Sequence, residues 1–185
     1  MRRIVVVVST MALIVLVAGG VALAANIQCV VNTTCFGTSM ADTMSGTALN
    51  DFMFGKAGAD TMHGYGDVDT LQGGKGSDHI YGDSGADNSL WGGDLTATET
   101  YPDNSNDYVY GGRGNDTIYG GYAQGGVDRL YGQGGNDLIN ASQRDQGFNP
   151  VTKEIIDCGA GASDEVWFDR NKDVVTNCEI KHGFS

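Results

Sequence analysis

Aspartate residues recur every nine positions through much of the chain, each at the end of a glycine-rich segment. Residues 73–81 (GGKGSDHIY) and 111–119 (GGRGNDTIY) both fit the pattern G-G-x-G-x-D-x-U-x, in which U is a large apolar residue. Glycine permits positive φ angles and close approach of neighbouring turns, so each repeat offers one carboxylate and several backbone carbonyls. An all-oxygen set suits Ca²⁺, which takes six to eight oxygen ligands in flexible geometry. The spacing therefore predicts a cation-binding turn in each repeat.

The repeats run in register from residue 37 to residue 140 with few interruptions. Insertions occur at about 91–106 and around 122–124, and the apolar position of the sixth repeat slips by one residue, from Ser89 to Leu90. Ten aspartates occupy the sixth position: Asp42, Asp51, Asp60, Asp69, Asp78, Asp87, Asp107, Asp116, Asp128 and Asp137.

Each repeat predicts a turn followed by a short strand, because its last three residues place one apolar side chain between two outward ones. Nine residues make half a coil, so aspartates two repeats apart stack on the same edge. Stacked strands lie ~4.8 Å apart, and carboxylates at that distance repel each other unless a cation lies between them. One edge is expected to carry Asp42, Asp60, Asp78, Asp107 and Asp128, and the other Asp51, Asp69, Asp87, Asp116 and Asp137.

Residues 37–140 resemble the haemolysin-type (RTX) calcium-binding repeats. The resemblance implies an all-β fold, a right-handed parallel β-roll solenoid, with several Ca²⁺ ions held between successive turns by the sixth-position aspartates and by turn carbonyls. Asp42 is expected to be the weakest ligand, because the first two repeats lack glycine at positions two and four. The implied ligands are the ten aspartates above, with carbonyls of turns such as Gly73, Gly74, Gly76, Gly111, Gly112 and Gly114.

The N-terminus has the features of an export signal. Arg2 and Arg3 precede an almost wholly apolar stretch, and Ala22-Leu23-Ala24 forms a small-x-small cleavage site. We expect residues 1–24 to be a cleaved signal peptide and the protein to be secreted or attached to the cell surface. The alternative is an uncleaved membrane anchor, since the apolar stretch is long enough to span a bilayer.

Four cysteines follow this segment: Cys29, Cys35, Cys158 and Cys178. An even number behind an export signal predicts two disulfides, with three possible pairings. Loop-closure entropy favours the near pairs, Cys29–Cys35 and Cys158–Cys178. A zinc site is the competing interpretation, but no C-x-x-C pair is present and no histidine lies near a cysteine at finger spacing.

A weaker nine-residue echo returns near the end of the chain, at Asp164 and Asp173. Cys158 and Cys178 bracket it, and a solenoid needs a cap over its open strand edge, so we expect a disulfide-linked C-terminal cap. The predicted segments are the signal peptide, a lead-in or N-terminal cap at 25–36, the β-roll at 37–140, a linker at 141–153, and the cap and tail at 154–185.

The formal net charge of −12 makes nucleic acid an improbable partner, because phosphate binding needs a basic face. No nucleophile or metalloprotease motif is present, so we expect a non-enzymatic protein that folds on binding Ca²⁺. One alternative is a calcium-dependent adhesive or glycan-binding module using the ninth-position tyrosines, which could equally pack across strands. Another is a hydrolase or lyase, with Asp94, Glu99 and Asp103 of the insertion. The tyrosines are Tyr81, Tyr110, Tyr119 and Tyr131.

Overall fold

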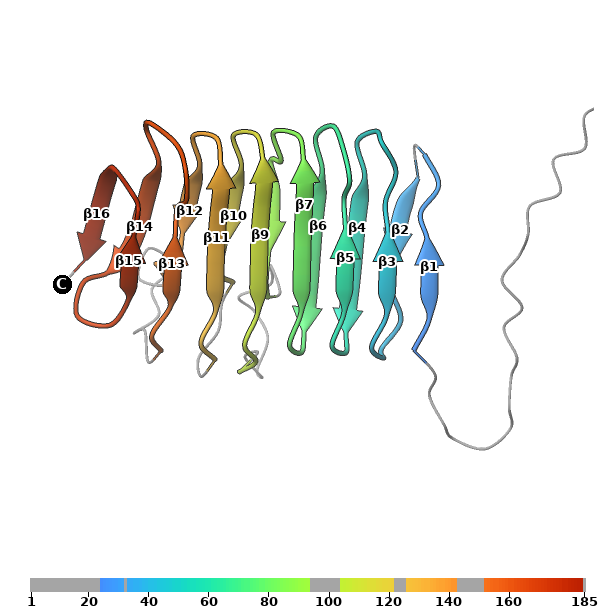
Figure 1. Ribbon diagram of the computed structural model, residues 1–185. Helices are drawn as coiled ribbons and strands as arrows, with labels where there is room; N and C mark the ends of the chain where they lie inside the picture. Colours follow the sequence, from blue (N-terminus) through green and yellow to red (C-terminus); the bar gives the residue numbers. More distant parts are fainter. Residues whose placement is uncertain (1–23, 32, 94–103, 122–125, 143–151, 185) are drawn as a thin grey trace, which may run out of the picture.

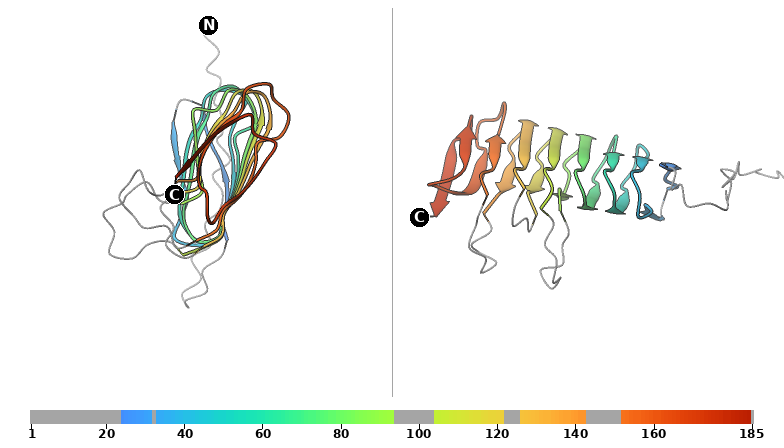
Figure 2. Two further views of the ribbon diagram at one scale, coloured as in Figure 1. Left: turned by 90° about the vertical axis from the view of Figure 1, so that its left-hand side faces the viewer. Right: turned by 90° about the horizontal axis from the view of Figure 1, so that it is seen from below.

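The computed structural model describes residues 24–31, 33–93, 104–121, 126–142 and 152–184. Over these residues the chain forms sixteen short strands in two parallel sheets, which face each other along an elongated roll (Figure 1). Seen along its axis, the roll is a flattened coil that repeats with little change from one end to the other (Figure 2). The predicted all-β parallel β-roll is therefore confirmed, and the described segments contain no helix.

Strands alternate between the two sheets, so each coil contributes one strand to each. The first sheet comprises β1 (Asn26–Gln28), β3 (Thr43–Ser45), β5 (Thr61–His63), β7 (His79–Ser84), β9 (Tyr108–Arg113), β11 (Arg129–Gly134), β13 (Ile155–Asp157) and β15 (Val174–Thr176). The second comprises β2 (Thr34–Phe36), β4 (Phe52–Ala57), β6 (Thr70–Lys75), β8 (Ser89–Trp91), β10 (Thr117–Tyr119), β12 (Leu138–Asn140), β14 (Glu165–Asp169) and β16 (Ile180–Phe184).

The core is a double row of apolar side chains, one from each strand from β3 to β14, which meet between the sheets. The predicted slip in the sixth repeat is confirmed, because Leu90 rather than Ser89 pairs with Leu71 and is fully buried. The parallel register keeps like positions side by side, so every coil repeats the same packing. Fully buried residues of these rows are Met44, Met53, Met62, Leu71, Ile80, Leu90, Val109, Ile118, Leu130, Ile139, Ile156 and Val166.

The segments expected as caps continue the roll. The lead-in supplies β1 and β2, and the C-terminal segment adds β13, β14, β15 and β16 to the two sheets in the same register. Both predicted disulfides are present, Cys29–Cys35 at one end and Cys158–Cys178 at the other, and no described cysteine is free. These pairs exclude the zinc interpretation.

Several predictions concern residues outside the described part of the chain. They are the signal peptide up to residue 23, most of the first insertion with Asp94, Glu99 and Asp103, and most of the linker. No helix in the described residues is long and apolar enough to cross a membrane.

Candidate calcium sites

The sixth-position aspartates form two hydrogen-bonded ladders, one along each edge of the roll. In the first ladder the backbone N–H of Asp42 donates to Oδ1 of Asp60, whose own N–H donates to Oδ1 of Asp78, and so on through Asp107 to Asp128, over distances of 2.7–2.9 Å. The second ladder links Asp51, Asp69, Asp87, Asp116 and Asp137 in the same way, over 2.8–2.9 Å. The predicted alignment of the two edges is confirmed.

Both ladders continue beyond the last predicted aspartate. The N–H of Asp128 donates to Oε2 of Glu154, and the N–H of Asp137 donates to Oδ1 of Asp164. The backbone N–H of Glu154 then donates to Oδ1 of Asp173, and that of Asp164 donates to Oε2 of Glu179. The echo at Asp164 and Asp173 could have shown this continuation. The two glutamates gave no such signal, because they differ from the repeat in both residue type and spacing.

The ladder hydrogen bonds use one carboxylate oxygen and leave the other buried. This second oxygen, Oδ2, has no hydrogen-bond partner among the described residues at six positions. A buried carboxylate oxygen without a donor is costly, so each position favours a bound cation or a proton. The atoms are Oδ2 of Asp60, Asp69, Asp87, Asp116, Asp137 and Asp164. Asp51, at the start of its ladder, differs, because its Oδ2 accepts from Thr47 and its Oδ1 is the oxygen without a partner in the described part of the chain.

Backbone carbonyls lie next to these oxygens. In the turn that begins at Gly55, a Cβ on that glycine would collide with Oδ2 of Asp60 and with the carbonyl of Gly73 in the next coil. Carbonyls at the fourth position point toward the next coil. The carbonyl of Gly85, for example, faces the α-carbon of Gly114. Carboxylate and carbonyl oxygens therefore converge between adjacent coils.

The fourth and second positions of these turns adopt left-handed backbone angles. Gly74, Gly76, Gly112 and Gly114 have φ of 107°, 112°, 116° and 130°. In the turns that begin at Gly55, Gly64, Gly82 and Gly132, non-glycine residues at these positions are also left-handed: Lys56, Tyr65, Asp67, Asp83 and Gln133 have φ of 68–79°. The predicted glycine carbonyls thus belong to turns of one repeated shape.

The first two turns differ in both backbone and hydrogen bonding. None of their non-glycine residues has a positive φ. The N–H and the hydroxyl of Thr38 donate to Oδ2 of Asp42 at 2.6 and 2.9 Å, and those of Thr47 donate to Oδ2 of Asp51 at 2.6 and 3.0 Å. The threonine at position two supplies donors to the oxygen that other turns leave without one. This geometry favours calcium binding from Gly55 onward over binding at the first two turns.

Burial raises the pKa of the ladder aspartates that lack a second partner. The pKa rises from 3.8 to about 6 for Asp60, Asp116 and Asp137, and to about 7 for Asp69 and Asp87. Loss of hydration is the largest cause, and the neighbouring ladder aspartate adds repulsion, while the ladder hydrogen bond opposes both. A cation at these oxygens would reverse the balance and hold the carboxylates ionised.

The donor set fits calcium better than a transition metal. No group of three or more His, Cys, Asp or Glu side chains suited to a metal occurs in the described part of the chain. Each site offers a carboxylate and carbonyl oxygens, which are hard ligands and match Ca²⁺. When bound, Ca²⁺ would supply the positive charge that stacked carboxylates lack.

The aromatic side chains form two separate rows rather than one ladder. Tyr81, Tyr110 and Tyr131 stack on the first sheet at centroid distances of 4.9 and 4.8 Å, and His63 extends the row by stacking on Tyr81 at 4.5 Å. Tyr119 does not belong to this row, because nine-residue repeats alternate between the sheets, and it stacks on Trp91 of the second sheet. The ring faces contact one another, as expected for cross-strand packing.

The three histidines are half-buried on the outer faces of the roll, and each stacks on an aromatic ring of a neighbouring coil. His63 also lies 3.0 Å from Asp83 through Nδ1, and His79 stacks on Tyr108. His182 stacks on Trp167 and contacts Glu165 at 3.0 Å. These rings align because the parallel register brings like positions of neighbouring coils side by side.

The fold and the site together define a β-roll with oxygen-rich turns. The model of the RTX calcium-binding nonapeptide repeat family matches residues 36–71, 63–94 and 101–139, which together make up more than half of the chain. The chain therefore belongs to the RTX calcium-binding nonapeptide repeat family, whose repeats bind Ca²⁺ and are typically not catalytic. Neither a curated protein nor a solved structure matches it.

Proposed function

We propose that this protein is an exported, non-enzymatic β-roll that folds on binding several Ca²⁺ ions and acts at or outside the cell surface. The observation that carries the proposal is the row of buried carboxylate oxygens that have no donor in the part of the chain that the structure describes. Without a cation, these stacked carboxylates repel each other across a core only two side chains wide. With Ca²⁺, the free energy of binding becomes free energy of folding.

Export is supported by the N-terminal sequence and by the disulfides. The basic start, the apolar stretch and the Ala22-Leu23-Ala24 box match a secretory signal. Two disulfides persist in an oxidising compartment and would be reduced in most cytosols. We propose cleavage after residue 24 and a mature chain beginning near Ala25. An uncleaved N-terminal segment would instead hold the roll at a membrane.

A glycan-binding role has less support from the geometry. Sugars stack on exposed aromatic faces, whereas the faces of Tyr81, Tyr110 and Tyr131 are occupied by one another. Their edges remain available for contact. A glycan array probed with and without Ca²⁺ would test this role, and calcium-dependent binding to one glycan class would favour it.

Circular dichroism of the mature chain tests the proposed function. Calcium-free protein should be largely disordered, and millimolar Ca²⁺ should induce β-structure, whereas Mg²⁺ at the same concentration should not. The mass of the secreted chain, measured without reduction, should match residues 25–185 less four hydrogens. A spectrum unchanged by chelator would refute calcium-dependent folding, and an intact Met1 would refute cleavage.

A further inference from the structure

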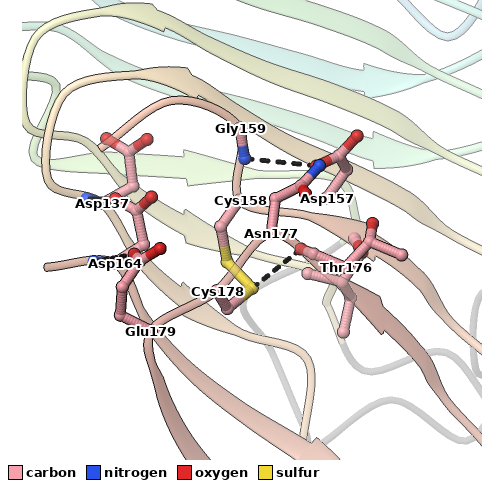
Figure 3. Close-up of a disulfide and its surroundings, with 10 residues drawn as sticks. Asp137, Asp157, Cys158, Gly159, Asp164, Thr176, Asn177, Cys178 and Glu179 are labelled. Carbon is pink, nitrogen blue, oxygen red and sulfur yellow. Dashed lines mark hydrogen bonds between the residues drawn. A yellow bond between two sulfur atoms is a disulfide. The ribbon is translucent and has the colours of Figure 1, made fainter. Parts of the chain in front are cut away.

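We propose that the C-terminal segment holds an additional calcium site, outside the matched repeats, with Asp164 as its carboxylate ligand. The proposal rests on the calcium-binding function proposed above and extends it to a segment that holds only a weak echo of the repeat and lies beyond the matched residues. Asp164 lies on the edge of the second sheet, one coil beyond Asp137 (Figure 3).

Asp164 has the same environment as the ladder aspartates of the central turns. Its side chain is completely buried, and Oδ1 accepts the N–H of Asp137 at 2.8 Å. Its own N–H donates to Oε2 of Glu179 at 3.0 Å. Oδ2 is buried and has no hydrogen-bond partner among the described residues. The same orphaned oxygen marks the candidate sites at Asp116 and Asp137.

The turn before Asp164 shares the left-handed position two and the close carbonyl approach of the central turns, although Gly161 at position four is not left-handed. Gly159 has a φ of 95° and follows Cys158, whose carbonyl faces the α-carbon of Gly132 in the preceding coil. The α-carbon of Gly161 lies against the carbonyl of Gly135 and against the Asp164 carboxylate. Carbonyl oxygens of two adjacent coils thus approach the orphaned oxygen.

Two sequence differences conceal this turn. Cys158 stands where the repeat has its first glycine, and seven residues rather than six run from that position to the aspartate. Cys158 also forms the disulfide with Cys178, which joins the turn to the residue directly before Glu179 (Figure 3). The disulfide therefore links the two strand ends on either side of the proposed site.

The other ladder ends differently. Glu154 accepts the hydroxyl of Thr152 through Oε1 and the N–H of Asp128 through Oε2. Asp173 accepts the N–H of Glu154 through Oδ1 and that of Asp169 through Oδ2. Both oxygens of each side chain have protein donors there. We therefore assign the additional site to the edge with Asp164 alone.

Native mass spectrometry of the mature chain in calcium tests the assignment by counting bound ions. Asp164→Asn keeps an oxygen that can accept the ladder hydrogen bond but removes the charge. Asp157→Asn is the matched control, because it removes one acidic charge from the same segment and its Oδ1 serves only Gly159 and Asn177 in the described contacts. We expect Asp164→Asn to bind one ion fewer than both the wild type and Asp157→Asn.

An unchanged ion count in Asp164→Asn would overturn the assignment while leaving the proposed function intact. A wild type that binds no calcium would refute the proposed function itself. If Asp164→Asn does not fold in calcium, the anomalous difference map of a wild-type crystal grown in Ca²⁺ decides. A calcium peak ~2.3–2.6 Å from Asp164 Oδ2 supports the site. Peaks beside Asp116 and Asp137 without one beside Asp164 contradict it.

Discussion

The first two turns of the roll and the turns that follow have the same register. They differ in whether the chain supplies a hydrogen-bond donor to the second carboxylate oxygen, Oδ2, of the aspartate. In the first two, Thr38 and Thr47 donate to the carboxylate oxygen that faces the turn. From Gly55 onward that oxygen has no donor among the described residues at most ladder positions. The turns that begin at Gly55, Gly64, Gly73, Gly82, Gly111 and Gly132 adopt left-handed angles at positions two and four. The same coil can thus be closed either by hydrogen bonds within the chain or by a cation.

This difference gives the two regions different roles. Under the proposed function, the hydrogen-bonded turns should form without an ion and offer an ordered strand edge on which later coils assemble. The turns with orphaned oxygens should depend on calcium, and each shares its ladder with the next coil. Stability in a stacked repeat is approximately a sum of local and nearest-neighbour terms, so the calcium-dependent turns should fold cooperatively.

The largest effect should come from removing a central carboxylate. Asp60→Asn removes the charge beside an orphaned oxygen, whereas Asp42→Asn, one coil earlier in the same ladder, affects a carboxylate held by Thr38. We expect Asp60→Asn to weaken calcium binding about tenfold, or ~1.4 kcal/mol, and Asp42→Asn to change it little. Titration calorimetry measures both, and equal losses would refute the comparison.

Converting an early turn into a central one should add a site. Thr47→Gly with Leu49→Gly removes the hydroxyl donor to Asp51 and allows left-handed angles at positions two and four. We expect the double variant to bind one more Ca²⁺ than the wild type, as counted by native mass spectrometry. The matched control is Thr47→Ser, which keeps the hydroxyl and should leave the count unchanged. No additional ion in the double variant would mean that the threonine does not determine occupancy.

The pH should affect the metal-free and the calcium-bound roll in opposite directions. Burial raises the pKa of Asp69 and Asp87 from 3.8 to about 7 in the folded, metal-free chain. The folded state then binds more protons than the unfolded state between about pH 4 and pH 7, so its stability rises as the pH falls through that interval. Protons compete with Ca²⁺ for the same oxygens, so calcium affinity should fall over the same range.

Circular dichroism of calcium-stripped protein should therefore show more β-structure at pH 5 than at pH 8. Calorimetry with added Ca²⁺ should show weaker binding at pH 5. Metal-free protein that is less ordered at pH 5 than at pH 8 would contradict the assignment of raised pKa values to these aspartates.

The smallest difference should separate the two disulfides. Cys158–Cys178 closes a sequence separation of 20 and Cys29–Cys35 one of 6. In the chain-entropy model these loops contribute roughly 3 and about 2 kcal/mol. Urea unfolding in saturating calcium should show a larger loss for Cys158→Ala/Cys178→Ala than for Cys29→Ala/Cys35→Ala. The reverse order would show that the N-terminal coil controls unfolding.

Much of the fold followed from the sequence because the repeat encodes it directly. The nine-residue period fixed which aspartates share an edge, and the slip at Leu90 was visible in the spacing of apolar residues. Near-neighbour loop closure also selected the correct disulfide pairs. The hydrogen bonds of Thr38 and Thr47 were not predictable, because they depend on whether a side chain at position two reaches the aspartate. Glu154 and Glu179 were missed because their side chains and spacing depart from the repeat.

The central claim is that the orphaned ladder oxygens are calcium ligands and the threonine-bound oxygens are not. A crystal of the mature protein grown in Ca²⁺, with data collected for anomalous scattering from calcium, tests it most directly. The account predicts peaks ~2.3–2.6 Å from Oδ2 of Asp60, Asp69, Asp87, Asp116 and Asp137, and none at Oδ2 of Asp42 or Asp51. Peaks of equal height at Asp42 and Asp51, or no peak at the five central aspartates, would contradict it.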